Sequence, residues 1–209
     1  MEALNKSMSI EDIIKEYDKC KFSEEIGKFL ESKDITFEVI DGIVCVKSKP
    51  LEHDFAKKFI TSLIDKELDK KGLDCDSFIE LRMLRGVNYG NDFLIPDVSV
   101  LNISEGNYGS NGMFLGIPKL VIEIMSSNRN DDINKKRLLY GEMGIPEYWI
   151  VDLDTSTITQ LILKNGSYGK KGTFHMEGNI KHHLCGLKLN LEDIFKLIND
   201  KLTKLNKTK

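Results

Sequence analysis

The sequence predicts a mixed α/β fold, of the α+β kind, in which helices flank a hairpin-connected sheet. Apolar residues at helical spacing over residues 52–71 predict a long amphipathic helix. Three β-rich runs follow, near residues 77–84, 93–101 and 119–126, and a further helix and strand close the series. The order helix, strand, strand, strand, helix, strand is typical of a sheet with helices packed on it.

The chain's beginning predicts two short helices and a hairpin. The sequence "SIED" from Ser9 is a capping-box-like helix start, and "SEEIGKFLES" from Ser23 predicts a second helix. Asp41-Gly42 joins two β-rich runs, and this dipeptide favours a two-residue hairpin turn. We therefore expect a helical extension at 1–34 ahead of the main domain.

Later elements follow from the same signals. The long helix should stop at Gly72, and the Gly-, Asn- and Ser-rich residues 102–118 should form a loop. A helix over residues 131–144, ending at Gly144, precedes a strand in "PEYWIVDL". Asn165-Gly166 predicts a second hairpin, and "LEDIFKLINDKL" a closing amphipathic helix. The main domain is expected over 35–190, with a C-terminal helix and tail at 191–209.

Composition limits the classes of function. With 209 residues, 41% of them hydrophobic and 30% charged, the chain is long enough for one sizeable globular domain with additions. A net charge of -3 excludes nucleic-acid binding by the whole surface, so any DNA contact must be local.

We expect neither a membrane span nor a signal peptide. No apolar run approaches the roughly 20 residues of a membrane span, and the first residues lack the apolar stretch of a signal peptide. Four separated cysteines without a C-x-x-C pair favour reduced thiols over a zinc site. We expect a soluble, cytoplasmic protein without a membrane partner.

Glu123 lies inside the apolar run "KLVIEIM". In a strand, Val121, Glu123 and Met125 face one side, and the apolar residues between them face the other. Apolar residues on both faces indicate a central strand covered on both sides. A buried carboxylate there costs several kcal/mol unless it is paired or binds a metal. The alternative is an edge position where Glu123 reaches solvent.

Asp97 in "IPDVSV" gives Glu123 an acidic companion on the preceding strand. Pro96 cannot donate to a strand ladder, so it favours a strand start or irregularity. Two carboxylates on successive strands can converge on one Mg²⁺ (or Mn²⁺), which takes one or two carboxylates and several waters.

A cation is available on the helix that follows. Lys136 shares a helix face with Asp132 and Tyr140, and a surface Asp132–Lys136 pair is the simpler interpretation. Lys135 and Arg137 are neighbours, and spacing alone does not choose among the three cations.

Several motifs together resemble the Uma-type family of restriction endonucleases, a branch of the PD-(D/E)xK nuclease superfamily. They are Pro96-Asp97, Glu123-x-x-Ser126, Lys136-x-x-x-Tyr140 and "GIPEYWIVD" at residues 144–152. Upstream, "FEVIDG" and "KPLEHDFAKKFI" match further family segments and give Glu38 and His53. The resemblance covers residues 35–165, and the set is far more specific than any single piece.

The resemblance implies a restriction-endonuclease-like core and a role for each motif residue. Asp97, Glu123 and the backbone carbonyl of Ile124 would hold the metal, and Glu38 would help to position water. His53 would contact water or phosphate, or else would be a polar residue at the helix start. Most of the superfamily has a lysine two residues after the glutamate, where this chain has Met125, and the implied replacement is Lys136.

The same resemblance implies a Mg²⁺-dependent endonuclease that acts on DNA. Because the net charge is negative, we expect the DNA contact to be a local basic rim made of Lys135, Lys136, Arg137, Arg82 and Arg85, which a homodimer would double. Tyr140 and Trp149 are expected in the core or the site wall, and Ser126 in the loop that leaves the strand. The alternative is a catalytically silent nuclease-fold protein that acts as a binding or regulatory module. A hydrolase of small phosphate esters is weaker, because no Gly-rich phosphate loop opens a helix.

Overall fold

The computed structural model describes residues 8–47, 50–110, 112–125, 130–183 and 186–206. The chain forms two compact units. Unit 1 comprises Met1–Lys49 and Arg82–Ile95, and unit 2 comprises Pro50–Leu81 and Pro96–Lys209. The chain therefore passes from one unit to the other three times. The expected boundaries at residues 34 and 190 follow the order of the elements instead, and they stay a prediction.

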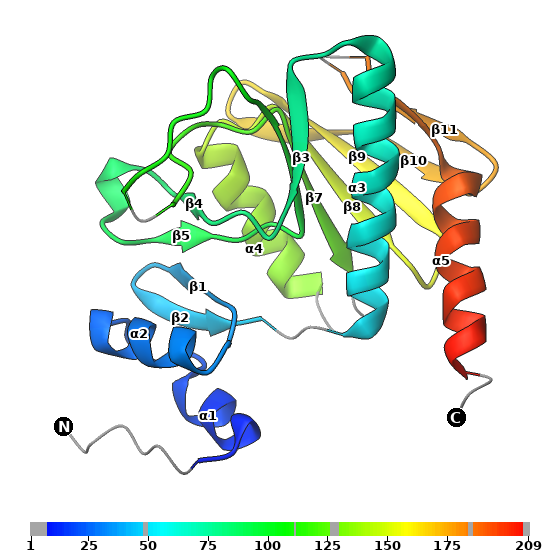
Figure 1. Ribbon diagram of the computed structural model, residues 1–209. Coiled ribbons are helices and arrows are strands. Elements are labelled where there is room, and N and C mark those ends of the chain that lie inside the picture. Colours follow the sequence, from blue (N-terminus) through cyan, green and yellow to red (C-terminus); the bar gives the residue numbers. More distant parts are fainter. Residues whose placement is uncertain (1–7, 48–49, 111, 126–129, 184–185, 207–209) are drawn as a thin grey trace. The chain divides into compact units, whose positions relative to one another are not determined.

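Unit 1 holds two short helices and a four-stranded antiparallel sheet with the strand order β2-β1-β5-β4 (Figure 1). Its elements are α1 (Ile10–Tyr17), α2 (Glu24–Ser32), β1 (Phe37–Ile40), β2 (Ile43–Val46), β4 (Met83–Leu84), the 3-10 helix η1 (Val87–Tyr89) and β5 (Phe93–Leu94). Both helices begin as predicted, because the Ser9 hydroxyl accepts the N–H of Asp12 and the Ser23 hydroxyl accepts that of Ile26.

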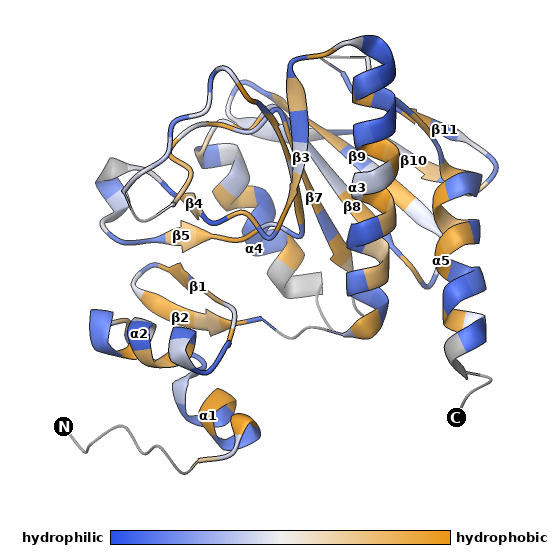
Figure 2. Cartoon of the chain, viewed as in Figure 1, coloured by the Kyte–Doolittle hydropathy of each residue, from blue (hydrophilic) through white to orange (hydrophobic). Residues whose placement is uncertain are grey.

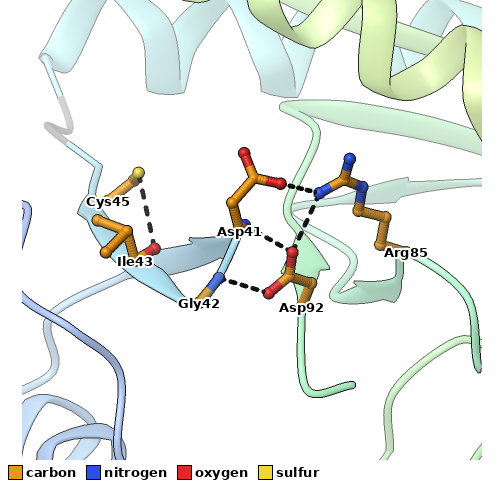
Figure 3. A network of polar contacts seen from close by, with 6 residues as sticks. All are labelled: Asp41, Gly42, Ile43, Cys45, Arg85 and Asp92. Atoms are coloured by element: carbon orange, nitrogen blue, oxygen red, sulfur yellow. Dashed lines mark hydrogen bonds and ion pairs between the residues drawn. The ribbon is translucent and has the colours of Figure 1, made fainter. Parts of the chain in front are cut away.

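The β1–β2 turn is fixed from outside the hairpin. Asp41 and Gly42 have φ angles of 56° and 72°, which confirms the predicted two-residue turn. The two carboxylate oxygens of Asp92 accept the N–H groups of Asp41 (2.6 Å) and Gly42 (2.9 Å). Arg85 donates from Nη1 to Asp41 at 2.5 Å and to Asp92 at 3.1 Å (Figure 3). This network ties the turn to the segment that precedes β5.

Unit 2 is built on a six-stranded sheet with the order β10-β9-β8-β7-β6-β3 and a separate β11–β12 pair. Neighbouring strands are antiparallel except β7 and β8, which are parallel because α4 connects them across the sheet. Its elements are α3 (Leu51–Lys71), β3 (Cys75–Ile79), β6 (Val98–Asn102), β7 (Leu120–Met125), α4 (Asn130–Glu142), β8 (Glu147–Asp152), β9 (Thr157–Lys164), β10 (Ser167–His175), β11 (Asn179–Lys181), β12 (Lys188–Asn190) and α5 (Leu191–Asn206).

Different helices cover the two faces of this sheet. Leu120, Ile122 and Ile124 of β7 lie in one hydrophobic core with the buried side chains of α3 and α5. The opposite face of β7 carries Glu123 and lies against α4 (Figure 1). Hydrophobic residues accordingly run through the sheet, while α5 shows alternating hydrophobic and hydrophilic bands (Figure 2). The prediction of a central β7, covered on both sides, is confirmed.

Two predicted strands are each interrupted. Residues 93–101 form β5 and β6 instead of one strand, because Pro96 has no N–H with which to continue the ladder. Residues 77–84 similarly divide into β3 and β4 around Glu80, whose φ of 52° takes the backbone out of the strand conformation. In both cases the two halves belong to different sheets. Strand-forming residues on both sides of each break led to the prediction of one continuous strand.

The remaining predicted stops and turns agree with the structure. Gly72 closes α3 with a φ of 62°, and Gly144 follows α4 with a φ of 77°. Asn165 and Gly166 form the β9–β10 turn with φ angles of 50° and 77°. Within the described residues, no helix has the length and apolar composition needed to cross a membrane.

Candidate active site

A hydrogen bond places the Asp97 carboxylate beside β7, next to Glu123. β6 and β7 are antiparallel with Val98 opposite Ile122, and Asp97 directly precedes Val98 in the chain while Glu123 directly follows Ile122. The Asp97 Oδ2 accepts the backbone N–H of Ile124, the residue after Glu123, at 2.8 Å, which fixes the Asp97 carboxylate against β7.

Glu123 is held by two side chains of α4. Its Oε1 accepts hydrogen bonds from Lys136 Nζ at 2.8 Å and from the Tyr140 hydroxyl at 2.5 Å. Lys136 and Tyr140 are four residues apart and thus share a helix face. Glu123 is 3% exposed, Lys136 2% and Tyr140 0%, so the contact is shielded from solvent. Tyr140, expected only as a core or wall residue, orients a carboxylate.

The three cations of α4 differ in their contacts. Lys136 contacts Glu123, whereas Lys135 is exposed and Arg137 donates to the backbone carbonyl of Tyr168. The interpretation of Lys136 as a surface residue is therefore wrong. The prediction of an exposed basic rim also fails at two positions, because Lys136 and Arg85 are both buried in ion pairs.

Like charges lie close together at this site. Two neighbouring carboxylates repel, and each costs several kcal/mol when removed from water without compensation. Lys136 supplies a positive charge close to Glu123, and both carboxylates are 3% exposed. A divalent cation bound by both carboxylates would lower their repulsion.

Tyr148 adds a buried polar atom to the same region. Its hydroxyl has no hydrogen-bond partner among the described residues. Burial raises the pKa of Tyr148 well above its ordinary value, and the negative charge of Glu123 raises it further. The hydroxyl therefore stays protonated and can donate to a water or an anion.

The donor set fits Mg²⁺ or Mn²⁺. The described residues contain no group of three or more His, Cys, Asp or Glu side chains that could hold a metal ion. Two carboxylates with water in the remaining positions suit Mg²⁺, which keeps several waters in proteins. The unpartnered Tyr148 hydroxyl matches such a hydrated ion. Residues that fit the role are Asp97 and Glu123, with the carbonyl of Ile124 as the predicted third donor.

A second buried lysine lies near Asp97. Lys57 of α3 is 3% exposed, and its Nζ lies 2.7 Å from Asp54 Oδ1 and 2.7 Å from Glu80 Oε1. Burial lowers the pKa of Lys57, but hydrogen bonds to Asp54 and Glu80 and the charge of Asp97 more than offset this, so the net shift is upward. Sequence reasoning missed Lys57 because the Lys57-Lys58 pair resembles a solvated helix surface. The sequence pointed to Lys57 through its position four residues after His53, because residues at this spacing share a helix face.

His53 and Ser126 stay predictions. His53 lies in the first turn of α3 and is 4% exposed, which fits a residue that faces the interior more than a solvated helix start. Ser126 lies outside the described residues.

Glu38 has a defined local function within unit 1. Its Oε1 accepts the backbone N–H of Ile95 at 2.7 Å, and Lys47 Nζ donates to the carbonyl of Ile95 at 2.6 Å. Both peptide groups of Ile95 are therefore fixed, directly ahead of Pro96-Asp97 in the chain. The predicted role of Glu38 in water positioning stays a prediction.

The "PEYW" part of the motif set is structural. Glu147 is fully buried and accepts hydrogen bonds from Trp149 Nε1 (2.5 Å), Gln160 Nε2 (2.5 Å) and the backbone N–H of His183 (2.6 Å). Trp149 lies in the core with α3 and α5, as expected. Glu147 therefore joins β8, β9 and the segment after β11.

Comparison with solved structures shows a protein that shares this fold. The chain is similar to the crystal structure of a putative nuclease belonging to DUF820 from Anabaena variabilis ATCC 29413, with 23% sequence identity and a TM-score of 0.64. The match covers 78% of this chain and 91% of that one, so the two share a nuclease-like α+β fold. A weak likeness to the cryo-EM structure of a DrdV–DNA complex has 13% identity and a TM-score of 0.31, and covers 70% of this chain and 14% of that one.

The family follows from a family model. Residues 23–192 match the Uma2 family, described as "Putative restriction endonuclease", and the chain belongs to this family. No curated protein matches this chain. The predicted family and fold are thereby confirmed.

Proposed function

We propose that this protein is a metal-dependent endonuclease that hydrolyses DNA phosphodiester bonds. The observation that carries the proposal is the Asp97 carboxylate bonded to the N–H of Ile124, next to Glu123, with Lys136 and Tyr140 bonded to Glu123. Family membership and the nuclease-like fold support the same reaction class.

Each residue has a proposed part in the reaction. Asp97, Glu123 and the Ile124 carbonyl would hold Mg²⁺ or Mn²⁺, and the ion would supply Lewis-acid stabilisation of the phosphate and a more acidic water. The Lys136 ammonium opposes the negative charge that develops on the phosphate. Tyr140 keeps the Glu123 carboxylate in position, and the Tyr148 hydroxyl donates to water.

The proposed partners are DNA and a second copy of the chain. A net charge of -3 makes a local contact necessary, and the exposed Lys135 on α4 supplies positive charge beside the site. A homodimer would double this contact. Glu38 and His53 are proposed to position water or phosphate, and the cytoplasm is the proposed location.

Nicking of supercoiled plasmid with Mg²⁺ or Mn²⁺ tests the proposal. We expect Asp97→Asn and Glu123→Gln to lose activity by at least about 100-fold, and Lys136→Met by a similar factor, because each removes a charge at the reacting phosphate. Lys164→Met is the control and should stay within about twofold of wild type, since Lys164 is exposed at the end of β9 and has no proposed role in the reaction or in DNA binding. Equal residual cleavage by all variants would indicate a contaminating nuclease and overturn the site.

The catalytically silent binding module is the second candidate function. Two observations favour it: Met125 occupies the position of the usual lysine, and the Lys136 ammonium is already bonded to Glu123. It predicts salt-dependent DNA binding by wild type without cleavage in either metal. Cleavage that depends on Asp97 and Glu123 would exclude it.

A further inference from the structure

The β9–β10 hairpin of unit 2 has an unusual charge balance. Residues 155–176 contain three lysines and one histidine but neither aspartate nor glutamate, although the whole chain has a net charge of -3. β10 is also an edge strand of the six-stranded sheet, with no strand beyond it in the part of the chain that the structure describes. Lysines on such an edge either repel other strands or attract an anionic partner.

Lys170 of this hairpin lies on the face of the sheet that carries Glu123. Strand pairing connects one row of residues across the sheet, made of Val121 in β7, Tyr148 in β8, Leu161 in β9 and Lys170 in β10. Residues paired in this way share a face of the sheet, and Glu123, two residues after Val121 in the same strand, shares it as well. The Lys170 side chain is exposed on that face.

Lys170 and Lys171 carry charges that no other described residue balances. Both are exposed, and neither side chain has an ion pair or a hydrogen bond among the residues that the structure describes. The β9–β10 register shifts between Lys170 and Gly172, as in a β-bulge, so Lys171 is an extra residue at the edge of the sheet. Two adjacent positive charges are therefore available to a partner.

Helix α4 connects these two lysines with the candidate active site. Lys136 of α4 bonds to Glu123 in β7, and the next residue, Arg137, donates to the backbone carbonyl of Tyr168 in β10. From β7 to β10 the sheet measures about 14 Å at about 4.8 Å per strand, the length of about four base steps of DNA at about 3.4 Å each. DNA that reached both strands would pass over α4, where Lys135 is exposed.

We propose that Lys170 and Lys171 bind the phosphate backbone of the DNA that is cut at the Asp97–Glu123 site. This inference rests on the proposed function, and it names a surface for the local contact that a net charge of -3 makes necessary. A lysine ammonium is a point charge on a flexible stem, so the contact is with phosphates and does not depend on base sequence. Lysines that only protected the sheet edge would leave DNA affinity unchanged when replaced.

Lys164 supplies a matched control within the same hairpin. It is exposed and has no ion pair among the described residues, as is also true of Lys170. Lys164 is an even number of residues from Ile158, whose side chain lies in the core with α3 and α5, so it belongs to the opposite face of the sheet. A contact on the Glu123 face should therefore not depend on Lys164, whereas general attraction to a basic hairpin would depend on all three lysines.

Fluorescence anisotropy of a short labelled DNA duplex, titrated with the full chain without divalent metal, tests this inference apart from cleavage. We expect Lys170→Gln with Lys171→Gln to weaken binding on the order of a hundredfold near 0.1 M salt, and to reduce the slope of log K against log salt concentration by about 2, since each phosphate contact contributes about 0.9. Lys164→Gln, and the charge-preserving Lys170→Arg with Lys171→Arg, should bind as wild type does. Circular dichroism and sedimentation check that each variant is folded and does not aggregate.

Charge reversal supplies a second test if the neutral double variant aggregates. Lys170→Glu with Lys171→Glu keeps a charged edge, so it should remain dispersed, and it should bind the duplex still more weakly.

The outcomes separate this inference from the proposed function. Unchanged affinity and salt slope in either double variant, or equal weakening by Lys164→Gln, would overturn the inference, while nicking of plasmid by wild type would leave the proposed function in place. Wild type that nicks plasmid but does not measurably bind the duplex would overturn the inference as well. Wild type that neither binds nor nicks DNA would overturn the proposed function, and the inference with it.

Discussion

In unit 1 Arg85 lies between Asp41 and Asp92, and in unit 2 Lys136 bonds to Glu123 beside Asp97, so both clusters contain two carboxylates and a buried basic side chain. The two clusters differ in the kind of donor that stabilises the carboxylates.

The unit 1 cluster uses backbone donors and solvent. Both oxygens of Asp92 accept backbone N–H groups of the β1–β2 turn, and the Asp41 side chain is 61% exposed. A carboxylate that accepts two backbone N–H groups is well stabilised as an anion without any ion. The cluster is therefore complete as a device that holds a turn.

The unit 2 cluster depends mainly on side chains. Glu123 accepts from Lys136 and Tyr140, Asp97 accepts one backbone N–H, that of Ile124, and both carboxylates are 3% exposed. Side-chain donors can give way to a ligand without a change in the backbone, which suits the proposed metal and phosphate site. Under the proposed function, the kind of donor separates a metal site from a structural ion pair.

The largest effect on stability is expected from Lys136→Met. This change leaves Glu123 buried without its cation and should lower the free energy of unfolding by about 3–5 kcal/mol at neutral pH. Urea unfolding measures it.

The double variant Glu123→Gln with Lys136→Met tests whether the stability loss comes from the unpaired charge of Glu123. Removing both charges should recover most of that loss, since the buried amide still accepts the Tyr140 hydrogen bond, while nicking activity stays absent. Recovery of activity together with stability would contradict a catalytic role for this pair.

Asp92→Ala should have the next largest effect. It leaves the N–H groups of Asp41 and Gly42 without their acceptor and removes a carboxylate from Arg85, at a cost of about 2–3 kcal/mol. Mn²⁺ affinity should not change, because this cluster holds a turn. Asn91→Ala, at the exposed neighbouring position, is the control and should be nearly neutral. A loss of Mn²⁺ affinity in Asp92→Ala would remove the distinction between the two clusters.

The sequence predicted the unit 2 cluster better than the unit 1 cluster, for a physical reason. Glu123 and Asp97 stand out because a carboxylate in an apolar strand needs a partner, and strand periodicity predicts the face on which they lie. Arg85 and Asp92 lie in a polar stretch after β4, where charged residues are ordinary, so nothing marks their burial.

The limits of sequence reasoning are the same at the strand breaks and at Lys57. Pro96 was recognised as an irregularity, yet the assignment of β5 and β6 to different sheets depends on pairing partners far away in the chain. The burial of Lys57 depends equally on Glu80, which lies beyond the turn that ends α3. Contacts distant in sequence decide these features, and local patterns do not record them.

A smaller effect should separate two neighbouring tyrosines. Tyr140→Phe removes a hydrogen bond to the buried Glu123 and should cost about 1–2 kcal/mol of stability. Tyr148→Phe is the matched control, because its ring lies 5.3 Å from that of Tyr140 and its hydroxyl has no partner within the described part of the chain. This variant should be neutral or slightly stabilising in urea unfolding without metal. A large loss in Tyr148→Phe would mean that its hydroxyl already has a partner without metal.

The smallest effect appears only at alkaline pH. Burial raises the pKa of Tyr148 well above its ordinary value of 10.0, with the charge of Glu123 as a further cause, and burial also raises that of Tyr168. Above about pH 10 the unfolded chain releases these protons while the folded chain keeps them, so stability is complete below that pH and falls above it. Each tyrosine contributes a slope of about 1.4 kcal/mol per pH unit. Urea unfolding at pH 9, 10 and 11 should show that Tyr148→Phe removes one such slope. A pH dependence identical to wild type would mean that Tyr148 is ionised as readily when folded as when unfolded, and that the interior beside Glu123 is far more polar than its burial implies.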